Sequence, residues 1–237
     1  MATLLHMGVV GVDACKGGWI GVVLRRRDSI LTGVFADSLD RLADEVPDAE
    51  AFAIDIPIGL PSVGGRSDGR RRADVEARVF VGPRRSSVFF TPVRDALTAP
   101  THAEATSTST RLTGRGISQQ AFALRTRILE AERWARGTSV PAWEIHPEVS
   151  FAVMLGYPAR SPKITWAGMR ERLRALEREG FSLDGLGDAG EHAGADDVLD
   201  AAAAAWSAAR LLRGDGISLP DPPEVDAESG RPVAIWA

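Results

Sequence analysis

Cysteine and long apolar runs are scarce in this chain, and both shortages restrict what the protein can be. The 237 residues include a single cysteine, Cys15, which excludes an internal disulfide framework and favours a cytoplasmic location. No apolar run approaches the roughly 20 residues that a membrane helix needs. The N-terminal MATLLHM also lacks the basic flank and apolar core of a signal peptide. We therefore expect no membrane partner.

Excess positive charge is also absent, and lysine is nearly so. The formal net charge is −4, which argues against a protein that coats nucleic acid over its whole surface, so any polyanion site must be local. The 28 basic residues are 26 Arg and two Lys, Lys16 and Lys163. With the many alanines, this bias indicates a GC-rich genome, so arginine runs carry less weight than the two lysines. Lys16 lies three residues after Asp13 and is a candidate to neutralise charge there, although both lysines could be ordinary surface residues.

Length and the apolar pattern predict one α/β domain over residues 1–237 with five strands and several helices. Strands are expected at 8–13, 18–25, 29–36, 51–55 and 142–146. Helices are expected at 37–46, 67–81, 165–180 and 195–212, and Ser118 is expected to cap another. The stretch 62–140 reads as a helical insertion after the fourth strand, in which the polar, Thr/Ser-rich stretch 95–117 is expected to be a mobile loop. The tail 231–237 reads as an edge strand or a strap.

Four carboxylates stand out in this pattern. Asp13 and Asp55 each end an apolar strand, so they should emerge where open α/β sheets build their sites. Asp197 and Asp200 are three residues apart on a helix and share a face. Two ionised carboxylates about 4 Å apart repel by roughly 4 kcal/mol, so such a group stays ionised only around a cation. Oxygen ligands favour Mg²⁺ or Mn²⁺, which would suit phosphodiester hydrolysis.

Each acid also has a simpler interpretation. Asp13 or Asp55 could cap a turn, and Asp197 could simply interact favourably with the helix dipole at the N-terminus of its helix. Asp200 lies one turn further in and precedes five alanines, which would let the helix approach the sheet closely. The sequence leaves open whether Asp197 or Asp200 is the main ligand.

Two further groups are candidates for contact with a substrate. Glu144, His146 and Glu148 follow a strand and could act as acid, base or extra ligands, or could only hydrogen-bond the adjacent loop. An arginine-rich block could grip phosphate through forked hydrogen bonds, although Arg70 to Arg72 could equally form a solvated helix face. The candidates for substrate binding are Arg78, Arg85, Ser86 and Ser87 at the end of this block and Lys163 further along the chain.

Several motifs together resemble one known family. They are GVDACKGGW, IDIPIGLP, ADVEARVFVGPRRSSVFFTP, EIHPEVSF with KITWAGMRERL, and DDVLDAAAAAWSA. In combination they are similar to a family of predicted ribonuclease H-like nucleases, formerly a domain of unknown function. The resemblance implies a ribonuclease H-like fold, with a mixed five-stranded central sheet flanked by helices. Related junction resolvases place acids at the positions of Asp13, Asp55, Asp197 and Asp200. In those relatives the fourth-strand acid is often Glu, so Asp55 has a shorter reach.

The resemblance also implies roles and partners. Asp13 would bridge two metal ions, Asp55 with Asp197 or Asp200 would complete them, and Lys16 or an arginine would neutralise the reacting phosphate. We therefore expect a nuclease dependent on Mg²⁺ or Mn²⁺ that acts on nucleic acid, with a homodimer possible by analogy. Two alternatives stay open. One is a phosphotransferase or phosphatase acting on a small phosphorylated substrate, and the other is a non-catalytic module that binds a nucleotide or nucleic acid.

Overall fold

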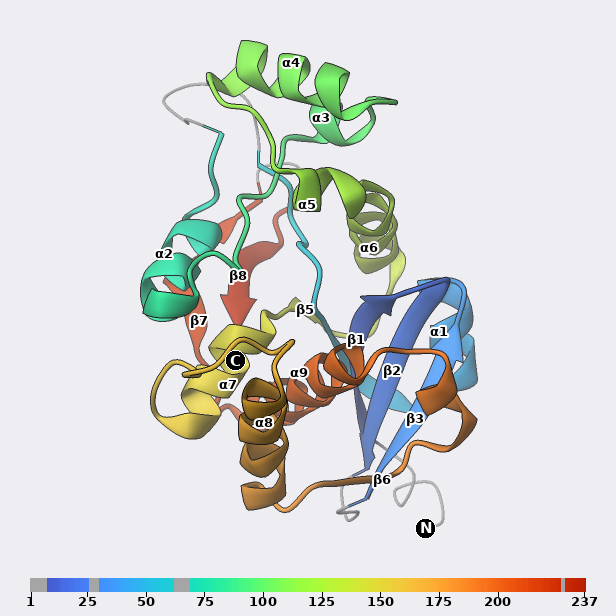
Figure 1. The fold of residues 1–237 in the computed structure, drawn as a ribbon. Coiled ribbons are helices and arrows are strands. Elements are labelled where there is room, and N and C mark those ends of the chain that lie inside the picture. Colours follow the sequence, from blue (N-terminus) through green and yellow to red (C-terminus); the bar gives the residue numbers. More distant parts are fainter. Residues whose placement is uncertain (1–7, 26–29, 62–68, 227–228) are drawn as a thin grey trace.

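A six-stranded mixed sheet forms the centre of the computed structural model, which describes residues 8–25, 30–61, 69–226 and 229–237 (Figure 1). Its strand order is β5-β4-β1-β2-β3-β6. Neighbours pair antiparallel in β1–β2 and β2–β3 and parallel in β1–β4, β4–β5 and β3–β6. The strands are β1 (Gly8–Cys15), β2 (Gly18–Arg25), β3 (Ile30–Ala36), β4 (Ala49–Ile54), β5 (Ala142–Glu144) and β6 (Ser182–Gly185). The five expected strands are confirmed.

The sixth strand corrects the expected number. Residues 182–185 belong to a stretch that reads as a Gly-rich acidic linker, yet they pair with β3 at its outer edge. A strand of four residues, SLDG, with one apolar side chain has too little apolar alternation to be detected in the sequence. The tail also forms β structure, because β7 (Ser218–Val225) and β8 (Pro232–Trp236) make a separate antiparallel ribbon that meets the end of β5 through a bridge between Ile145 and Trp236.

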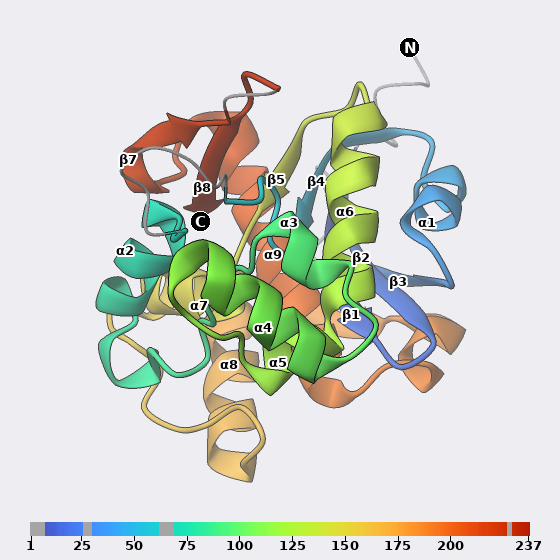
Figure 2. The ribbon, with the colours of Figure 1, turned by 90° about the horizontal axis from the view of Figure 1, so that it is seen from above.

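Helices cover both faces of the sheet, as the views in Figures 1 and 2 show. Successive residues of a strand point to opposite faces, so Val9 packs in the core beneath α9 (Ala195–Arg213), whereas Val10 packs beneath α1 (Leu39–Glu45) and α6 (Arg125–Gly137). On the α9 side lie α7 (Pro147–Leu155), α8 (Trp166–Arg178) and the short 3-10 helix η3 (Gly187–Glu191). In the described part of the chain no helix is long and apolar enough to cross a membrane.

The contact between α9 and β1 is unusually close. A Cβ placed on Gly11 would lie 2.0 Å from the carbonyl oxygen of Ala201 and 2.0 Å from the backbone nitrogen of Ala205. The helix surface here consists of the alanine run, whose side chains are buried, so the helix backbone rests directly on the strand. This approach brings the first turns of α9 beside the ends of β1 and β4.

The regular elements in the described part of the insertion are all helices, and residues 102–113 of the stretch expected to be a loop form one of them. Its elements are α2 (Arg72–Phe80), the 3-10 helix η2 (Gly82–Arg84), α3 (Arg94–Leu97), α4 (His102–Thr113), α5 (Gln119–Ala123) and α6. Thr101 caps α4 by accepting a hydrogen bond from the Glu104 N–H, and Gly114 ends it with a φ of 74°. Most Thr and Ser side chains of α4 are at least partly exposed, so the polar composition of 95–117 is that of a surface helix.

Helix boundaries elsewhere follow the sequence with small shifts. Ser118 does cap a helix, but that helix breaks at Leu124 into α5 and α6. The helix expected over 67–81 is α2, which begins only at Arg72. Residues 67–68 lie outside the described residues. The helix α2 packs on the β7–β8 ribbon in a small separate apolar cluster with α7, which includes Ala77, Val149 and Ile235.

Candidate metal centre

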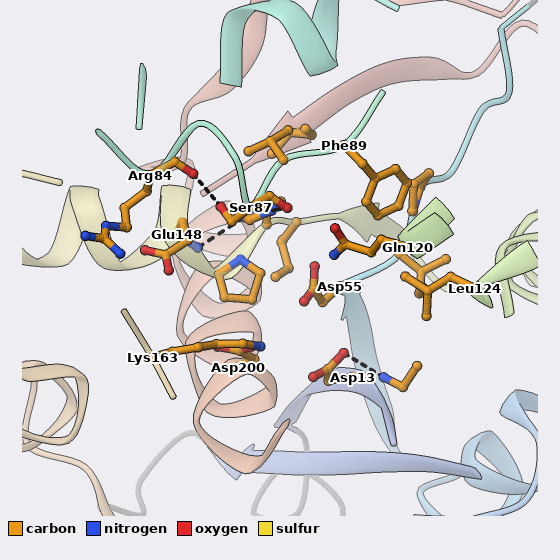
Figure 3. A pocket seen from close by; sticks show the side chains of 18 of the residues that line it. Asp13, Asp55, Arg84, Ser87, Phe89, Gln120, Leu124, Glu148, Lys163 and Asp200 are labelled. Carbon is orange, nitrogen blue, oxygen red and sulfur yellow. Dashed lines mark hydrogen bonds and ion pairs between the residues drawn. The ribbon is translucent and has the colours of Figure 1, made fainter. Parts of the chain in front are cut away.

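Three acids from three different elements meet at one edge of the sheet. Asp13 lies in β1, Asp55 follows β4 directly, and Asp200 lies in the second turn of α9. The parallel pairing of β1 with β4 continues to the acids, because the Asp55 N–H donates to the Val12 carbonyl at 2.8 Å. One carboxylate oxygen from each of the three acids lies within 4.8 Å of the others, and this group could hold a metal ion (Figure 3).

The hydrogen bonds within the group leave acceptors free. Asp13 Oδ1 accepts from the Ala14 N–H at 2.7 Å. Asp200 Oδ2 pairs closely with the Lys163 ammonium, whereas Asp200 Oδ1 is buried without a hydrogen-bond partner among the described residues. A buried carboxylate oxygen without a partner is costly unless a cation or an ordered water satisfies it. The donor set therefore fits a hard divalent cation such as Mg²⁺ or Mn²⁺.

Burial and mutual repulsion make these acids hard to ionise. Burial raises the pKa of Asp13 well above its usual value, and the neighbouring Asp55 and Asp200 add to the rise while Lys163 opposes it. Burial likewise raises the pKa of Asp55 from 3.8 to about 7, against the opposing Lys163. The pKa of Asp200 also rises to about 7, with the same principal cause and the same opposing charge. A bound cation would reverse these shifts by favouring the ionised forms.

A cavity of about 430 Å³ opens above the acids. Figure 3 shows Lys163 and Asp200 on one side, Phe89 and Leu124 on the other, and Asp55 between them. The two sides differ in chemistry, since one carries charged groups and the other an aromatic ring and an aliphatic side chain. Gln120 adds an exposed side-chain amide to the second side. The cavity therefore offers an ionic floor with an apolar wall, which is typical of sites for small molecules or for single units of a polymer.

The chain was compared with known proteins over its whole length. The model of a family described as "Protein of unknown function (DUF429)" matches residues 11–225. The chain belongs to this family. No curated protein and no solved structure matches the chain. The matched stretch contains Asp13, Asp55 and Asp200.

Asp197 lies at the cavity but outside the group of three acids. Its Oδ2 accepts a hydrogen bond from the Gly194 N–H at 3.2 Å, so this carboxylate binds a backbone N–H at the start of α9. Burial raises the pKa of this half-buried carboxyl, and the adjacent Asp196 adds to the rise. Of the two helix acids, Asp200 is thus the one that the structure brings to Asp13 and Asp55.

Lys163, rather than Lys16, is the lysine that reaches the acids. Lys16 is exposed in the turn between β1 and β2 and is not among the residues that line the cavity. Lys163, in the segment before α8, reaches the acids instead, with its Nζ paired to Asp200 and 3.7 Å from Asp196. Burial lowers the pKa of Lys163, but Asp200, Asp55 and Asp13 outweigh this and leave it above its usual value. The site therefore contains its own counter-ion.

Glu144 is held by a buried arginine that the sequence does not single out. Arg71 is only 3% exposed, and it donates to Glu144 Oε2 at 2.6 Å and to Glu144 Oε1 at 2.7 Å. Arg71 also pairs with Asp74 and donates to the carbonyls of Ile58 and Gly59, while Glu144 accepts from the Ile58 N–H at 2.7 Å. Burial raises the pKa of Glu144 to about 7, against Arg71. Glu144 and Arg71 line the cavity, but their polar atoms tie the loop after β4 to the insertion.

His146 and Glu148 lie at the start of α7. The His146 Nδ1 accepts from the Glu148 N–H at 3.2 Å, and its Nε2 lies 3.4 Å from the Ser87 carbonyl oxygen. Burial lowers the pKa of His146. Glu148 Oε1 accepts from the buried Arg172 at 2.6 Å, but Oε2 is buried with no partner in the part of the chain described here. Glu148 thus lines the cavity and has one carboxylate oxygen, Oε2, with no hydrogen-bond partner among the described residues.

The arginines around η2 lie in different surroundings, and not all of them line the cavity. Arg78 donates to the carbonyl of Arg85 at 2.7 Å and to that of Val88, and its guanidinium lies 4.7 Å from the Phe90 ring centroid, so it shapes the loop. Arg85 is exposed and outside the cavity lining, which Arg84, Ser86 and Ser87 join instead. The Ser87 hydroxyl donates to the Arg84 carbonyl at 2.8 Å. In a run of similar residues, only the fold decides which arginine faces the cavity.

Proposed function

We propose that this protein is a divalent-metal-dependent hydrolase of phosphodiester bonds, a nuclease built on a ribonuclease H-like core. The observation that carries the proposal is the convergence of Asp13, Asp55 and Asp200, whose oxygens lie within 4.8 Å of one another beside an open cavity. Acids placed from two parallel strand ends and one helix are suited to holding Mg²⁺ or Mn²⁺. An unpartnered oxygen on Asp200 supports this use.

The topology supports the ribonuclease H-like part of the proposal. Three antiparallel strands come first, and β4 and β5 then extend the sheet in parallel beside β1. The last long helix packs on β1 and contributes an acid to the same edge. This is the arrangement implied by the sequence motifs, and β6 with the β7–β8 ribbon are additions to it.

The residues present would divide the work of hydrolysis. Asp13, Asp55 and Asp200 would hold the ion, which when bound supplies positive charge and lowers the pKa of a water molecule. A water oxygen bonds to phosphorus, the bond to the leaving ester oxygen breaks, and one water proton passes to that oxygen while the other is released from the product phosphate. Lys163 stands where it can stabilise the phosphate charge.

A second candidate is hydrolysis of a small phosphorylated compound. The cavity of about 430 Å³ favours it, because that volume encloses a ligand of one or two rings rather than a duplex. The same acids would serve either reaction. The distinction lies in whether the substrate carries one or two ester bonds on its phosphorus.

A panel of substrates separates these possibilities. Labelled single-stranded and double-stranded DNA, RNA, an RNA–DNA hybrid and a branched junction would be incubated with Mn²⁺, Mg²⁺ or EDTA. Bis(4-nitrophenyl) phosphate and 4-nitrophenyl phosphate would be assayed beside them as a small diester and a small monoester. We expect metal-dependent cleavage of a polymer and of the small diester.

Variants show whether any activity belongs to this site. Asp55→Asn and Asp200→Asn should lose activity by at least 100-fold, whereas Asp197→Asn, altered at the cavity but outside the acid group, should keep most of it. Cleavage of the monoester alone would replace the proposal with the second candidate. Activity that survives in Asp55→Asn, or no turnover of any substrate with either metal, would contradict both and leave a binding role.

A further inference from the structure

One face of α8 carries an aromatic residue and three arginines at intervals of four residues. They are Trp166, Arg170, Arg174 and Arg178. Residues four apart lie one above another on a helix, so these side chains form a single stripe along it. Trp166, at the first position of α8, is 72% exposed. A tryptophan so exposed contributes little to the core and is instead available for contact with a partner.

The stripe lines a hollow of about 400 Å³ together with Tyr157 and Arg160. The Arg160 guanidinium lies 4.8 Å from the Tyr157 ring centroid, and the Arg170 guanidinium lies 5.6 Å from the Trp166 ring. Guanidinium groups beside aromatic rings form a surface that offers both positive charge and flat apolar faces.

No carboxylate in the described part of the chain pairs with the guanidinium of Arg160, Arg170, Arg174 or Arg178. The hollow also holds one acid, Glu171, which accepts from the backbone N–H groups of Arg160 at 3.0 Å and Ser161 at 3.2 Å, and its single negative charge leaves the four arginines in excess. Other exposed arginines do have acidic partners, as Arg41 has Asp37 and Arg133 has Asp40. In a protein of net charge −4, this face is therefore a local concentration of positive charge.

The hollow is continuous with the metal centre along the chain. Arg160 and Ser161 line the hollow, and the next three residues, 162–164, line the acid cavity. Arg84 of the acid cavity donates to the Arg160 carbonyl at 3.0 Å, which joins the two walls. Ile164, between them, is 85% exposed. Helix α8 begins two residues after Ile164, which lines the cavity, so its first turn is the part nearest to that lining along the chain. The course of the helix can be followed in Figure 1.

We propose that this face of α8 binds a single-stranded nucleic acid that continues out of the metal centre. Trp166 would stack on an unpaired base, and the arginines would contact successive phosphates. Stacking requires a base whose face is free, which favours a single strand over a duplex. The charge of the face favours a polyanion. The direction of the strand rests on the proposed function, because the reacting phosphate must lie at the acids.

Binding can be measured without cleavage. A labelled 12-nucleotide single strand and a hairpin duplex would be titrated with protein in EDTA, at several salt concentrations, by fluorescence anisotropy. The test variants are Trp166→Ala and the triple variant Arg170→Gln/Arg174→Gln/Arg178→Gln. The matched control is Arg41→Gln/Arg133→Gln/Arg213→Gln, which removes the same charge from exposed arginines elsewhere that have acidic partners. Melting temperatures would show that all of them fold.

The expected results follow from the contacts. The α8 triple variant should weaken binding at least tenfold and reduce the slope of log K against log salt by about 2, since each lost phosphate contact removes roughly 0.7. Trp166→Ala should weaken binding about 5- to 100-fold and leave the slope unchanged. The control triple should bind like the wild type.

Hydrolysis of bis(4-nitrophenyl) phosphate with Mn²⁺ separates this inference from the proposed function. Retained diester hydrolysis in the α8 variants, together with lost strand binding, supports both. Strand binding through α8 without diester hydrolysis by the wild type supports the surface and contradicts the nuclease. Equal binding by the α8 triple and its control, absence of strand binding at low salt, or equal binding of the duplex would overturn the inference, whatever the esterase result.

Discussion

Replacing Asp55 with asparagine should stabilise the metal-free protein at pH 8. Burial and neighbouring charges raise the pKa of Asp55 from 3.8 to about 7, so holding the ionised form in the fold costs up to about 4 kcal/mol above pH 7. Solvent reaches part of this side chain and screens its charge, so the expected gain is about 1–3 kcal/mol. For a chain of this size that corresponds to a rise in Tm of about 2–10 °C.

The sign of the pH dependence follows from the same shift. Because the folded pKa is above the unfolded one, the folded state takes up the proton first as pH falls through 7. The cost is full above pH 7 and disappears toward pH 4, so at pH 5 the stabilising effect of the asparagine should fall to about two fifths of its size at pH 8. Binding of Mn²⁺ requires the ionised acids, so the rise in wild-type Tm produced by Mn²⁺ should shrink over the same interval.

Scanning calorimetry in EDTA and in Mn²⁺, at pH 8 and pH 5, measures all of these quantities. Asp197→Asn serves as the control, because Asp197 caps α9 and lies outside the acid group, so it should retain the Mn²⁺-dependent rise. A lower Tm for Asp55→Asn at pH 8 in EDTA would mean that Asp55 is a structural hydrogen-bond acceptor. A Mn²⁺-dependent rise that survives in this variant would refute the assignment of Asp55 as a ligand.

Three further changes test other parts of the structure. Gly11→Ala would place a methyl 2.0 Å from two backbone atoms of α9, so we expect a loss above 3 kcal/mol in urea unfolding; a loss below 1 kcal/mol would contradict the close approach. Arg71→Met leaves Glu144 and Asp74 buried without their cation and should cost about 3–5 kcal/mol in the same assay, partly recovered by adding Glu144→Gln. Lys163→Met removes the internal counter-ion, so calorimetric titration should show tighter Mn²⁺ binding by several-fold; weaker binding would show that the lysine organises the acids rather than competing with the ion.

The sheet edge was predictable from the sequence because strands have a simple signature. Asp13 and Asp55 each follow an apolar run that reads as a buried strand, and parallel neighbours must end at the same edge. The choice between Asp197 and Asp200 was not predictable from their spacing, since both share a helix face. It depends on how deeply α9 lies on β1, and that depth is set by the contact at Gly11.

Charged residues were harder to place because their type does not reveal their partners. Three arginines follow one another at positions 70–72, and the sequence does not distinguish them. Arg71 is nevertheless buried, and its guanidinium donates to Glu144, which is 73 residues away in the chain. Lys16 is near Asp13 in the chain, but the turn after β1 leaves it exposed. Lys163 reaches the acids from a segment that is distant from all three of them in the chain. Such long-range pairings carry no local pattern.

The backbone contact between β1 and α9 also bears on which ions the acids can accept. Asp13 belongs to the strand and Asp200 to the helix, and no side chain separates their backbones at Gly11. The distance between the backbones that carry these two acids therefore has little room to adjust by repacking elsewhere. Mg²⁺ binds oxygen at roughly 2.0–2.1 Å and Ca²⁺ at roughly 2.3–2.6 Å with more ligands. If the acids bind an ion as proposed, a frame of such stiffness would discriminate between ions by their radius, and the alanines of α9 would set its size.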